Sequence, residues 1–349
     1  MVRVAVAGAS GYIGAELLRL LLGHPKVEIT GVTSERLAGE PLGRAYPHLR
    51  GLTQLVFHDL EADWLAETAE VVFFALPHGE SQRVMPTLRR RSIRAIDLSA
   101  DYRLRDPNEY ATWYKAPHID LPGLAEAVYG LPELHRKAIA GAPLVASPGC
   151  YPAGAILATA PLLKRGLARL DGIVIDGKSG LTGAGAQGRK LESMYLYTEA
   201  NENAQAYGIA SHRHTPEIEQ ELGALAGASL RVAFTPHLVP LNRGLFTTAS
   251  VPLAATLSTA ELLGLYREFY AAEPFVRVLG EDERPTTRGV VGSNYCDVGV
   301  VADGRTGRAV CVSAIDNLGK GGSANGVQVL NIMLGWPERT GLEAPPVYP

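Results

Sequence analysis

Residues 3–22 read Arg3-Val-Ala-Val-Ala-Gly-Ala-Ser-Gly-Tyr-Ile-Gly-Ala-Glu-Leu-Leu-Arg-Leu-Leu-Leu22. The apolar start predicts a short strand up to Ala7, and the composition after Ala15 predicts a helix. Between them, Gly8, Gly11 and Gly14 let the backbone turn tightly and approach a pyrophosphate, whose charge then lies at the helix N-terminus. A second predicted strand, Val27–Thr33, follows at the distance expected for a dinucleotide-binding unit. The fold class is therefore α/β, with an N-terminal Rossmann-type parallel sheet.

The end of that second strand should reach the adenosine ribose, where an acidic residue selects NAD and a basic one accommodates the 2′-phosphate of NADP. The sequence there is Thr33-Ser34-Glu35-Arg36. Ser34 can donate a hydrogen bond to a phosphate and Arg36 can pair with it, which favours NADP. Glu35 leaves NAD as the alternative.

Further strands of the same sheet are expected at residues 71–76, 94–98 and 144–147, and the first of these is a continuous apolar run. The loop after it begins at Pro77 and should lie over the nucleotide. Asp101 and Arg103 follow the strand at 94–98, at the edge where open α/β sheets bind ligands, although they could instead pair at the surface. Residues 106–122, rich in proline, tyrosine and charge, are expected to be irregular.

The segment Ser147-Pro-Gly-Cys-Tyr-Pro152 carries the most informative thiol of the chain. Pro148 and Gly149 resist regular structure and Pro152 has the backbone angle of a first helical turn, so Cys150 is expected where a loop becomes a helix. The amides and dipole of a helix N-terminus stabilise a thiolate and lower the cysteine pKa from about 8.5. This placement favours a nucleophile; the alternative is an inert buried cysteine.

After this helix the pattern changes. Strands expected at residues 172–176, 229–236, 244–251 and 309–315 are separated by long connections, which indicates an α+β domain with a largely antiparallel sheet. Thr215-Pro216-Glu217 predicts a helix start and leaves His212 and His214 exposed on the loop before it. The expected domains are residues 1–147, joined by a C-terminal helix over residues 321–349, and residues 148–320. An amphipathic helix over residues 323–334 should pack on the first domain.

The composition of the chain argues against several classes of protein. The chain has 349 residues with 33 basic and 36 acidic side chains and a net charge of −3, so nucleic acid is not an expected partner. Three cysteines without C-x-x-C spacing argue against a disulfide framework or a zinc site and favour a reducing, cytoplasmic location. No apolar run approaches the roughly 20 residues of a membrane span, and no targeting segment precedes the first strand.

A dinucleotide site together with an activated cysteine implies one reaction type. The thiolate attacks an acyl carbon, the leaving group departs, and hydride reduces the thioester to an aldehyde. A histidine with its unperturbed pKa near 6.5 suits the proton transfer at neutral pH. His212 and His214 are the candidates, although either could have a structural role.

Seven segments together resemble the signatures of the N-acetyl-gamma-glutamyl-phosphate reductase family, which is similar in fold and chemistry to aspartate-semialdehyde dehydrogenase. They are residues 8–14, 97–103, 147–152, 179–185, 207–208, 212–218 and 316–321. The resemblance implies NADPH-dependent reduction of N-acetyl-glutamyl 5-phosphate to the semialdehyde in arginine biosynthesis, by a homo-oligomer.

The resemblance also implies roles for single residues. Cys150 aligns with the nucleophile and His212 with the acid/base, with His214 and Tyr207 in support; the two histidines could exchange roles. The substrate-binding residues implied are Arg103, Arg213 and Glu217. The cofactor-binding residues implied are Gly8, Ser10, Gly11, Tyr12, Ile13, Gly14, Ser34, Arg36, Pro77, Ser179, Gly180 and Asn317, and no metal site is implied.

Three alternatives stay open at this point. A branch of the same family reduces a carrier-linked aminoadipyl phosphate in lysine biosynthesis, but it lacks a segment like Glu199-Ala-Asn-Glu-Asn203. If the protein were a nucleotide-sensing regulator, Cys150, His212 and His214 would have no catalytic role. A cysteine hydrolase would leave the dinucleotide motif unexplained.

Overall fold

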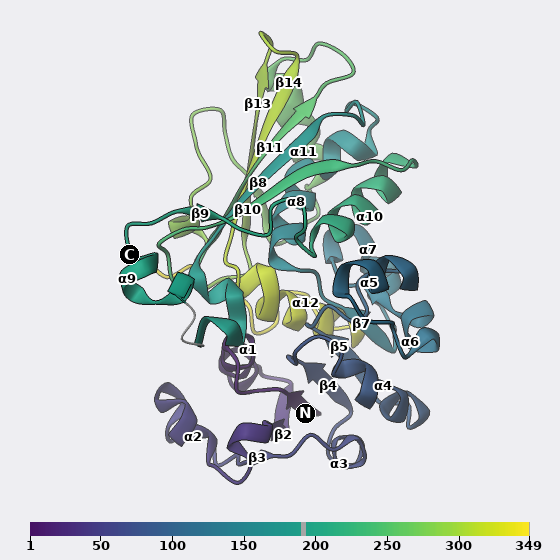
Figure 1. Ribbon diagram of the computed structural model, residues 1–349, viewed down its shortest axis with the longest axis vertical. Coiled ribbons are helices and arrows are strands. Elements are labelled where there is room, and N and C mark those ends of the chain that lie inside the picture. The colour runs from purple at the N-terminus through teal and green to yellow at the C-terminus, as the bar shows by residue number, and fades with distance from the viewer. Residues whose placement is uncertain (190–192, 349) are drawn as a thin grey trace. The chain divides into compact units, whose positions relative to one another are not determined.

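The structure is a computed structural model that describes residues 1–189 and 193–348 (Figure 1). The chain divides into two compact units. The first unit comprises Met1–Pro148 and Gly322–Ala344, and the second comprises Gly149–Gly321 and Pro345–Pro349.

The first unit is built on a sheet with the strand order β3-β2-β1-β4-β5-β7-β6, in which the paired strands run parallel. Its strands are β1 (Val2–Ala7), β2 (Val27–Thr33), β3 (Phe57–His58), β4 (Val71–Phe74), β5 (Arg94–Asp97), β6 (Val128–Tyr129) and β7 (Leu144–Ala146). Its helices are α1 (Tyr12–Leu22), η1 (Glu35–Leu37), α2 (Leu42–Ala45), η2 (Pro47–Leu49), α3 (Ala62–Thr68), α4 (Ser81–Arg90), α5 (Pro107–Tyr114), α6 (Leu121–Glu126), α7 (Pro132–Ile139) and α12 (Ala324–Met333).

Helices cover both faces of this sheet. The helices α3 and α4 pack on one face, where Ala5 and Phe74 join Leu65 and Met85 in a buried cluster. The helix α12 packs against β5 and α1, and a Cβ on its Gly326 would lie 3.4 Å from the Phe73 ring. A strand buried on both faces needs apolar residues at consecutive positions, which explains the continuous run in β4. The expected Rossmann-type sheet is confirmed.

The second unit contains a mixed sheet with the order β12-β13-β14-β11-β8-β10-β9. The pairs β12/β13 and β8/β10 are parallel and the other pairs are antiparallel, so the expectation of a largely antiparallel sheet is confirmed. Its strands are β8 (Ile173–Ser179), β9 (Gln205–Ala206), β10 (Val232–Leu238), β11 (Leu245–Pro252), β12 (Val276–Val278), β13 (Cys296–Asp303) and β14 (Arg308–Ile315). Its helices are α8 (Cys150–Lys164), η3 (Leu181–Arg189), η4 (Ser193–Tyr195), α9 (Tyr197–Ala200), α10 (Thr215–Ala226), α11 (Thr259–Phe269), η5 (Thr287–Gly289) and η6 (Gly319–Ser323).

The two faces of this second sheet differ in exposure. The helix α8 packs against β11 and β14, α11 packs against β13, and Figure 1 shows both helices beside the sheet with α10. Along β8, Ile173 and Ile175 are buried, whereas Val174 between them is 39% exposed. The period-two alternation means that one face of the sheet packs on helices and the other is more open.

The expectation of an irregular region at residues 106–122 is wrong, because α5 lies within it and α6 begins there. Asp106 accepts a hydrogen bond from the Asn108 N–H and caps α5, and Asp120 accepts one from the Gly123 N–H and caps α6. A proline follows in the first turn of each helix. An aspartate just before such a proline predicts the start of a helix. The prediction of irregular structure was wrong because it treated these prolines only as helix breakers.

The C-terminal region also differs from expectation. The helix expected over residues 323–334 is confirmed as α12, Ala324–Met333, but it does not continue to residue 349. Every residue of α12 is buried, and its polar side chains Asn325, Gln328 and Asn331 hydrogen-bond to other parts of the chain. Residues 345–349 group with the second unit, where the Val347 N–H donates to the Val291 carbonyl at 2.8 Å. The strand β13 was not predicted from the sequence, because its first residues include the charged Asp297 and a glycine.

Within the described ranges 1–189 and 193–348, no helix is long and apolar enough to cross a membrane. The same residues contain no cluster of histidine, cysteine or carboxylate side chains that could hold a metal ion.

Two aspartates are fully buried where β5 ends. Asp97 accepts hydrogen bonds from the N–H and hydroxyl of Ser99, both at 2.9 Å. Asp101 accepts hydrogen bonds from the Gly79 N–H, the Ser81 hydroxyl at 2.7 Å and the Tyr110 hydroxyl at 2.8 Å. Burial, followed by the charge of Asp101, raises the pKa of Asp97 to about 7. The alternative that Asp101 lies in a surface ion pair is wrong, because its side chain is 0% exposed.

We predict that Asp97→Asn reduces the pH dependence of stability. The folded-state pKa of Asp97, about 7, lies above its ordinary value of 3.8, so folding takes up a proton between these values and the free energy of unfolding falls as pH rises through them. Between about pH 5 and pH 7 the asparagine variant should gain roughly 2 kcal/mol relative to the wild type. Urea unfolding at several pH values measures this difference. The exposed Asp59→Asn is the control, and equal pH dependence in all three proteins would contradict the prediction.

Candidate active site

Cys150 is the first residue of α8, and the extended Gly149 is its N-cap. The Ala153 N–H donates to the Gly149 carbonyl at 2.9 Å, which closes the first turn of the helix. Cys150 is partly exposed, whereas Cys296 and Cys311 are buried. The structure therefore places this thiol at a helix N-terminus, where the local dipole stabilises a thiolate.

His212 and His214 precede α10 and are half-buried, so the expectation that the loop leaves them exposed is wrong. The His214 N–H donates to Nδ1 of His212 at 3.2 Å. Because Nδ1 accepts this bond, the neutral imidazole of His212 carries its hydrogen on Nε2. His212 is therefore arranged as a hydrogen-bond donor through Nε2.

Aromatic rings surround His212. The ring centroids of Tyr151, Tyr207, His214 and Phe234 lie 5.5, 5.3, 4.8 and 5.6 Å from its own. This burial, and then the charge of the exposed Arg213, lower the pKa of His212 to about 4. The interpretation that rested on an ordinary histidine pKa is corrected: His212 is neutral at neutral pH.

The rings around His212 form an aromatic cage, and two of its members, Tyr207 and Tyr151, are linked through their hydroxyl groups. The Tyr207 hydroxyl donates to the Tyr151 hydroxyl at 3.3 Å, which donates in turn to the His237 carbonyl at 2.9 Å. Burial is the largest cause that raises the pKa of both tyrosines, so both stay protonated at neutral pH. Tyr151 is a residue that the sequence analysis missed as part of the site, although it follows Cys150 directly.

Glu217 lies one turn into α10 and is 1% exposed. Its Oε1 accepts a hydrogen bond from the Gly149 N–H at 2.8 Å. A Cβ on Gly149 would lie 2.4 Å from Nε2 of His214, so the imidazole packs directly on the backbone of this glycine. Both side chains from the start of α10 thus contact the residue before Cys150.

A second turn of the same unit approaches Cys150 from residues 316–321. A Cβ on Gly321 would lie 2.7 Å from the Cys150 Cβ. Asn317 accepts a hydrogen bond from the Gly244 N–H and donates to Thr182, which follows Ser179 and Gly180 on the chain. The Ser179 hydroxyl donates to the Gly180 carbonyl at 2.9 Å. Three residues implied as cofactor ligands, Ser179, Gly180 and Asn317, therefore belong to the second unit together with the thiol.

The remaining implied cofactor residues belong to the first unit and surround the turn between β1 and α1. Gly8 has φ +80°, and a Cβ there would lie 2.6 Å from the Ala75 carbonyl oxygen, just before Pro77. This is the position between β1 and β4 where the strand order of the sheet reverses, and open α/β sheets bind nucleotides at such points. Gly11 is the N-cap of α1, and no heavy atom lies within 4 Å of where its Cβ would be. The space beside Gly11 at the helix N-terminus is therefore open, and a pyrophosphate there stays a prediction.

The neighbouring side chains support this turn in different ways. The Ser34 hydroxyl is buried and donates to Ser10 at 2.9 Å, whereas Glu35 and Arg36 are exposed. The Tyr46 hydroxyl donates to the Ala9 and Gly11 carbonyls, a role that the sequence analysis missed because Tyr46 lies outside the motif. The implied ligands Tyr12, Ile13 and Gly14 begin α1.

Arg103 is 7% exposed and lies in the first unit. Its Nε donates to the Ser147 carbonyl at 2.8 Å and its Nη2 donates to the Leu98 carbonyl at 3.0 Å. The side chain therefore ties the end of β5 to the end of β7. A role in reading the substrate phosphate stays a prediction.

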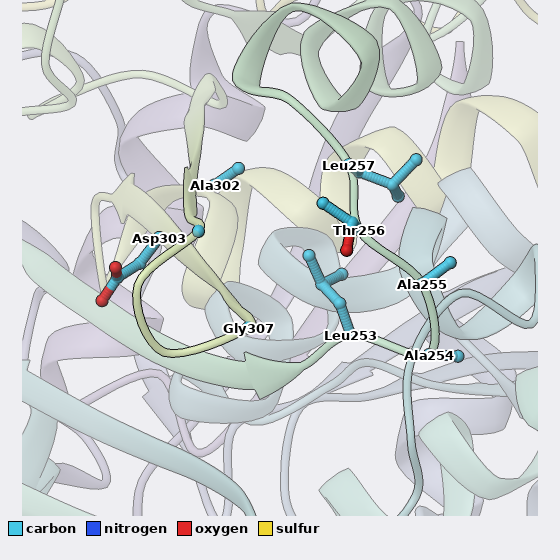
Figure 2. Close-up of a pocket in the computed structure, with 9 residues that line it drawn as sticks. Leu253, Ala254, Ala255, Thr256, Leu257, Ala302, Asp303 and Gly307 are labelled. Carbon is cyan, nitrogen blue, oxygen red and sulfur yellow. The ribbon is translucent and has the colours of Figure 1, made fainter.

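A separate pocket of about 190 Å³ lies in the second unit, where Figure 2 shows residues 253–257 facing the turn between β13 and β14. The residues at that turn are Ala302, Asp303, Gly304 and Gly307. Pro252 pairs with Arg308 at this end of β11, whereas Leu245 pairs with Ser179 at the other end. None of the residues singled out above lines this pocket.

Comparisons with known proteins agree with this geometry. Family models for the NAD binding domain and the dimerisation domain of semialdehyde dehydrogenase match residues 3–142 and 150–317. A crystal structure of aspartate semialdehyde dehydrogenase II from Vibrio cholerae is similar to 96% of this chain and 98% of its own, with a TM-score of 0.73 and 18% identity. The two units thus have the fold of the semialdehyde dehydrogenase class, and the first binds a nicotinamide dinucleotide.

Similarity in sequence identifies a more specific family within this class. N-acetyl-gamma-glutamyl-phosphate reductases from Geotalea daltonii and Moorella thermoacetica are 52% and 50% identical to this chain, over 100% of both sequences in each case. The chain belongs to the N-acetyl-gamma-glutamyl-phosphate reductase family. These relatives do not favour the lysine-branch, regulator and hydrolase alternatives.

We predict that His212 does not titrate near neutrality. Its ring resonances in a histidine NMR spectrum, assigned by comparison with His212→Asn, should stay constant from about pH 8 down to about pH 5.5, because burial holds its pKa near 4. Free histidine added to the same sample, with its ordinary midpoint near 6.5, is the control. A His212 midpoint near 6.5 would refute the neutral form and favour an acid/base role.

Proposed function

We propose that this protein is an NADPH-dependent N-acetyl-gamma-glutamyl-phosphate reductase. It reduces N-acetyl-glutamyl 5-phosphate to N-acetyl-glutamate 5-semialdehyde and releases phosphate, a step of arginine biosynthesis. The observation that carries the proposal is a partly exposed thiol at the N-terminus of α8, followed directly by Tyr151, whose ring contacts the half-buried His212. The names of relatives at about half identity over the whole chain support the choice of substrate.

Cys150 acts through its thiolate. The sulfur bonds to the acyl carbon, and the bond from that carbon to the phosphate oxygen breaks, so that phosphate leaves with the electron pair. A bound nicotinamide dinucleotide supplies the hydride that reduces the resulting thioester. The tetrahedral oxyanion then re-forms its carbonyl, and the carbon–sulfur bond breaks and returns its electron pair to Cys150. The thiolate suits both steps because it attacks well and leaves well.

His212 contributes at the carbonyl oxygen. In its neutral form it donates the Nε2 hydrogen bond to the oxygen on which negative charge develops in both steps. A donor is sufficient, since the oxyanion expels the thiolate directly and needs no proton from the protein. Tyr207 and His214 hold the ring through their contacts with it. Arg103 and Arg213 are proposed to bind the anionic phosphate and carboxylate of the substrate, for which guanidinium groups are suited.

NADP is the proposed cofactor. Exposed Arg36 follows β2, where a 2′-phosphate would lie, and Ser34 is placed beside the glycine turn through Ser10. Ser179, Gly180 and Asn317 of the second unit are proposed as further cofactor ligands, as the family resemblance implies.

Homo-oligomer formation and a cytoplasmic location are further parts of the proposal. The match to a dimerisation domain covers residues 150–317. On the more open face of its sheet, Val174 in β8 is 39% exposed and Val301 in β13 is 41% exposed. These apolar side chains are suited to contact with a second copy of the chain. The absence of a disulfide among the described cysteines fits a reducing compartment.

We predict that Cys150→Ser binds NADPH but loses reductase activity, because a neutral hydroxyl is a far weaker nucleophile than a thiolate. NADPH oxidation with the acyl phosphate, followed by absorbance, measures the loss. The matched controls Cys296→Ser and Cys311→Ser, at buried positions, should keep kcat close to wild type. If Cys150→Ser kept more than about a tenth of wild-type kcat, a loss under about 1.4 kcal/mol, covalent catalysis would be wrong.

We predict a preference for NADPH over NADH that depends on Arg36. Arg36→Ala should raise the KM for NADPH, because losing a charge-assisted contact costs roughly 1.5 to 3 kcal/mol, and should leave the KM for NADH unchanged. Arg50→Ala, a change at another exposed arginine of the same unit, is the control. Equal kcat/KM for the two cofactors in the wild type would instead favour Glu35 as a ribose ligand.

A further inference from the structure

The N-cap of the nucleophile's helix is held by a buried carboxylate. Glu217 occupies the first turn of α10, and its Oε1 accepts the Gly149 N–H at 2.8 Å while its side chain is 1% exposed. Gly149 immediately precedes Cys150, so this bond fixes the peptide that leads into the nucleophile. A buried carboxylate is expensive unless it makes such bonds, which implies that its place here is specific.

Packing adds a second constraint at the same residue. His214 is the N-cap of α10, and its Nε2 lies 2.4 Å from where a Cβ on Gly149 would be. The imidazole therefore occupies the space that any side chain at position 149 would need. On the other side, Gly321 approaches Cys150 closely enough that a Cβ there would lie 2.7 Å from the Cys150 Cβ. The backbone of residues 149–150 is thus held between α10 and the turn at 316–321.

The charge of Glu217 argues against the substrate-binding role that the family resemblance implies for it. The proposed substrate carries a carboxylate and an acyl phosphate, both anionic, and a carboxylate repels both. Tyr151 and Tyr207 lie close enough to Cys150 for its charge to raise their pKa values, and His214 packs on Gly149. His212 contacts both tyrosines, and the exposed Arg213 stands between the two histidines in the sequence. Among these, the arginine and the Nε2 donor are better suited than a carboxylate to an anionic substrate.

We propose that Glu217 is a positioning residue, whose hydrogen bond to Gly149 sets the backbone from which Cys150 attacks. The proposal rests on the proposed role of Cys150 as the nucleophile. A displacement of the sulfur by a fraction of an ångström away from the acyl carbon is costly for the attack, whereas substrate binding elsewhere is unaffected. Glu217 therefore acts on the rate of chemistry and not on affinity.

The test compares Glu217→Ala, Glu217→Gln and Glu219→Ala in the full-length protein. Glu219 is the matched control, since it lies on the same helix and its Oε1 accepts the Val232 N–H at 3.0 Å, a bond of the same kind to a different element. Two quantities are measured: kcat and KM in the reverse direction with the semialdehyde, phosphate and NADP, and the rate of Cys150 alkylation by iodoacetamide, followed by mass spectrometry. The second measurement needs no substrate.

We expect Glu217→Ala to lower kcat by at least about tenfold and to change the alkylation rate, with KM values within about threefold of wild type. Glu217→Gln should restore kcat to within about threefold, because its amide oxygen can accept the same N–H. Glu219→Ala should leave all three quantities near wild type. If Glu217→Ala is not folded, Glu217→Asp replaces it, since the shorter carboxylate keeps the charge and cannot reach Gly149.

Three outcomes overturn the proposal. A raised KM with unchanged kcat and alkylation rate would make Glu217 a substrate ligand. Equal losses in Glu217→Ala and Glu219→Ala would show a general effect of loosening α10. Losses in Glu217→Gln as large as those in Glu217→Ala would show that charge matters and the hydrogen bond does not. Full activity in Cys150→Ser would refute the role of Cys150 as the nucleophile. A wild-type protein without reductase activity would refute the proposed function itself, and each of these failures is distinct from a failure of the Glu217 proposal.

Discussion

The helix α8 is buried from Tyr151 to Leu163, and this burial constrains the rest of the second unit. A helix without a polar face must be covered on every side, and here β11, β14, α10 and α11 provide that cover. Its N-terminal end is the place where the thiol gains partial exposure. The position of Cys150 is therefore set by the packing of α8 together with the contacts that Glu217 and His214 make with Gly149.

Electrostatics separates the two kinds of residue around the thiol. His212, Tyr151 and Tyr207 are held neutral by burial, because a charged form would lose its hydration among the aromatic rings. Positive charge is contributed at exposed positions such as Arg213. In the proposed mechanism, neutral donors lie near the reacting carbonyl and cations lie farther out, which suits an anionic substrate whose charge moves onto oxygen during the reaction.

The sequence was informative where one local rule decides the structure. Local sequence was sufficient to predict three features: the glycine turn at Gly8, the strand Val27–Thr33 and the start of α8 at Cys150. In each case the residues of the segment itself determine the backbone conformation. The aromatic cage could not be predicted, since Tyr151, Tyr207 and Phe234 come from three separate elements that only tertiary folding brings together. The buried state of His212 was missed for the same reason: a loop before a helix is expected to be exposed, and its actual exposure depends on distant partners. The helices that begin after Asp106 and Asp120 could have been predicted from these capping residues. The high proline content of the segment was instead interpreted as a sign of irregular structure.

The chain passes from one unit to the other at three points, after residues 148, 321 and 344. Neither unit is therefore a continuous gene segment, and a fragment ending at residue 148 lacks the fully buried α12 that packs on its sheet. Producing the first unit alone requires a new linker that joins residues 1–148 to residues 322–344. During synthesis the first sheet must likewise wait for α12 until the whole second unit has been made, so the two halves of the protein cannot mature one after the other as independent modules.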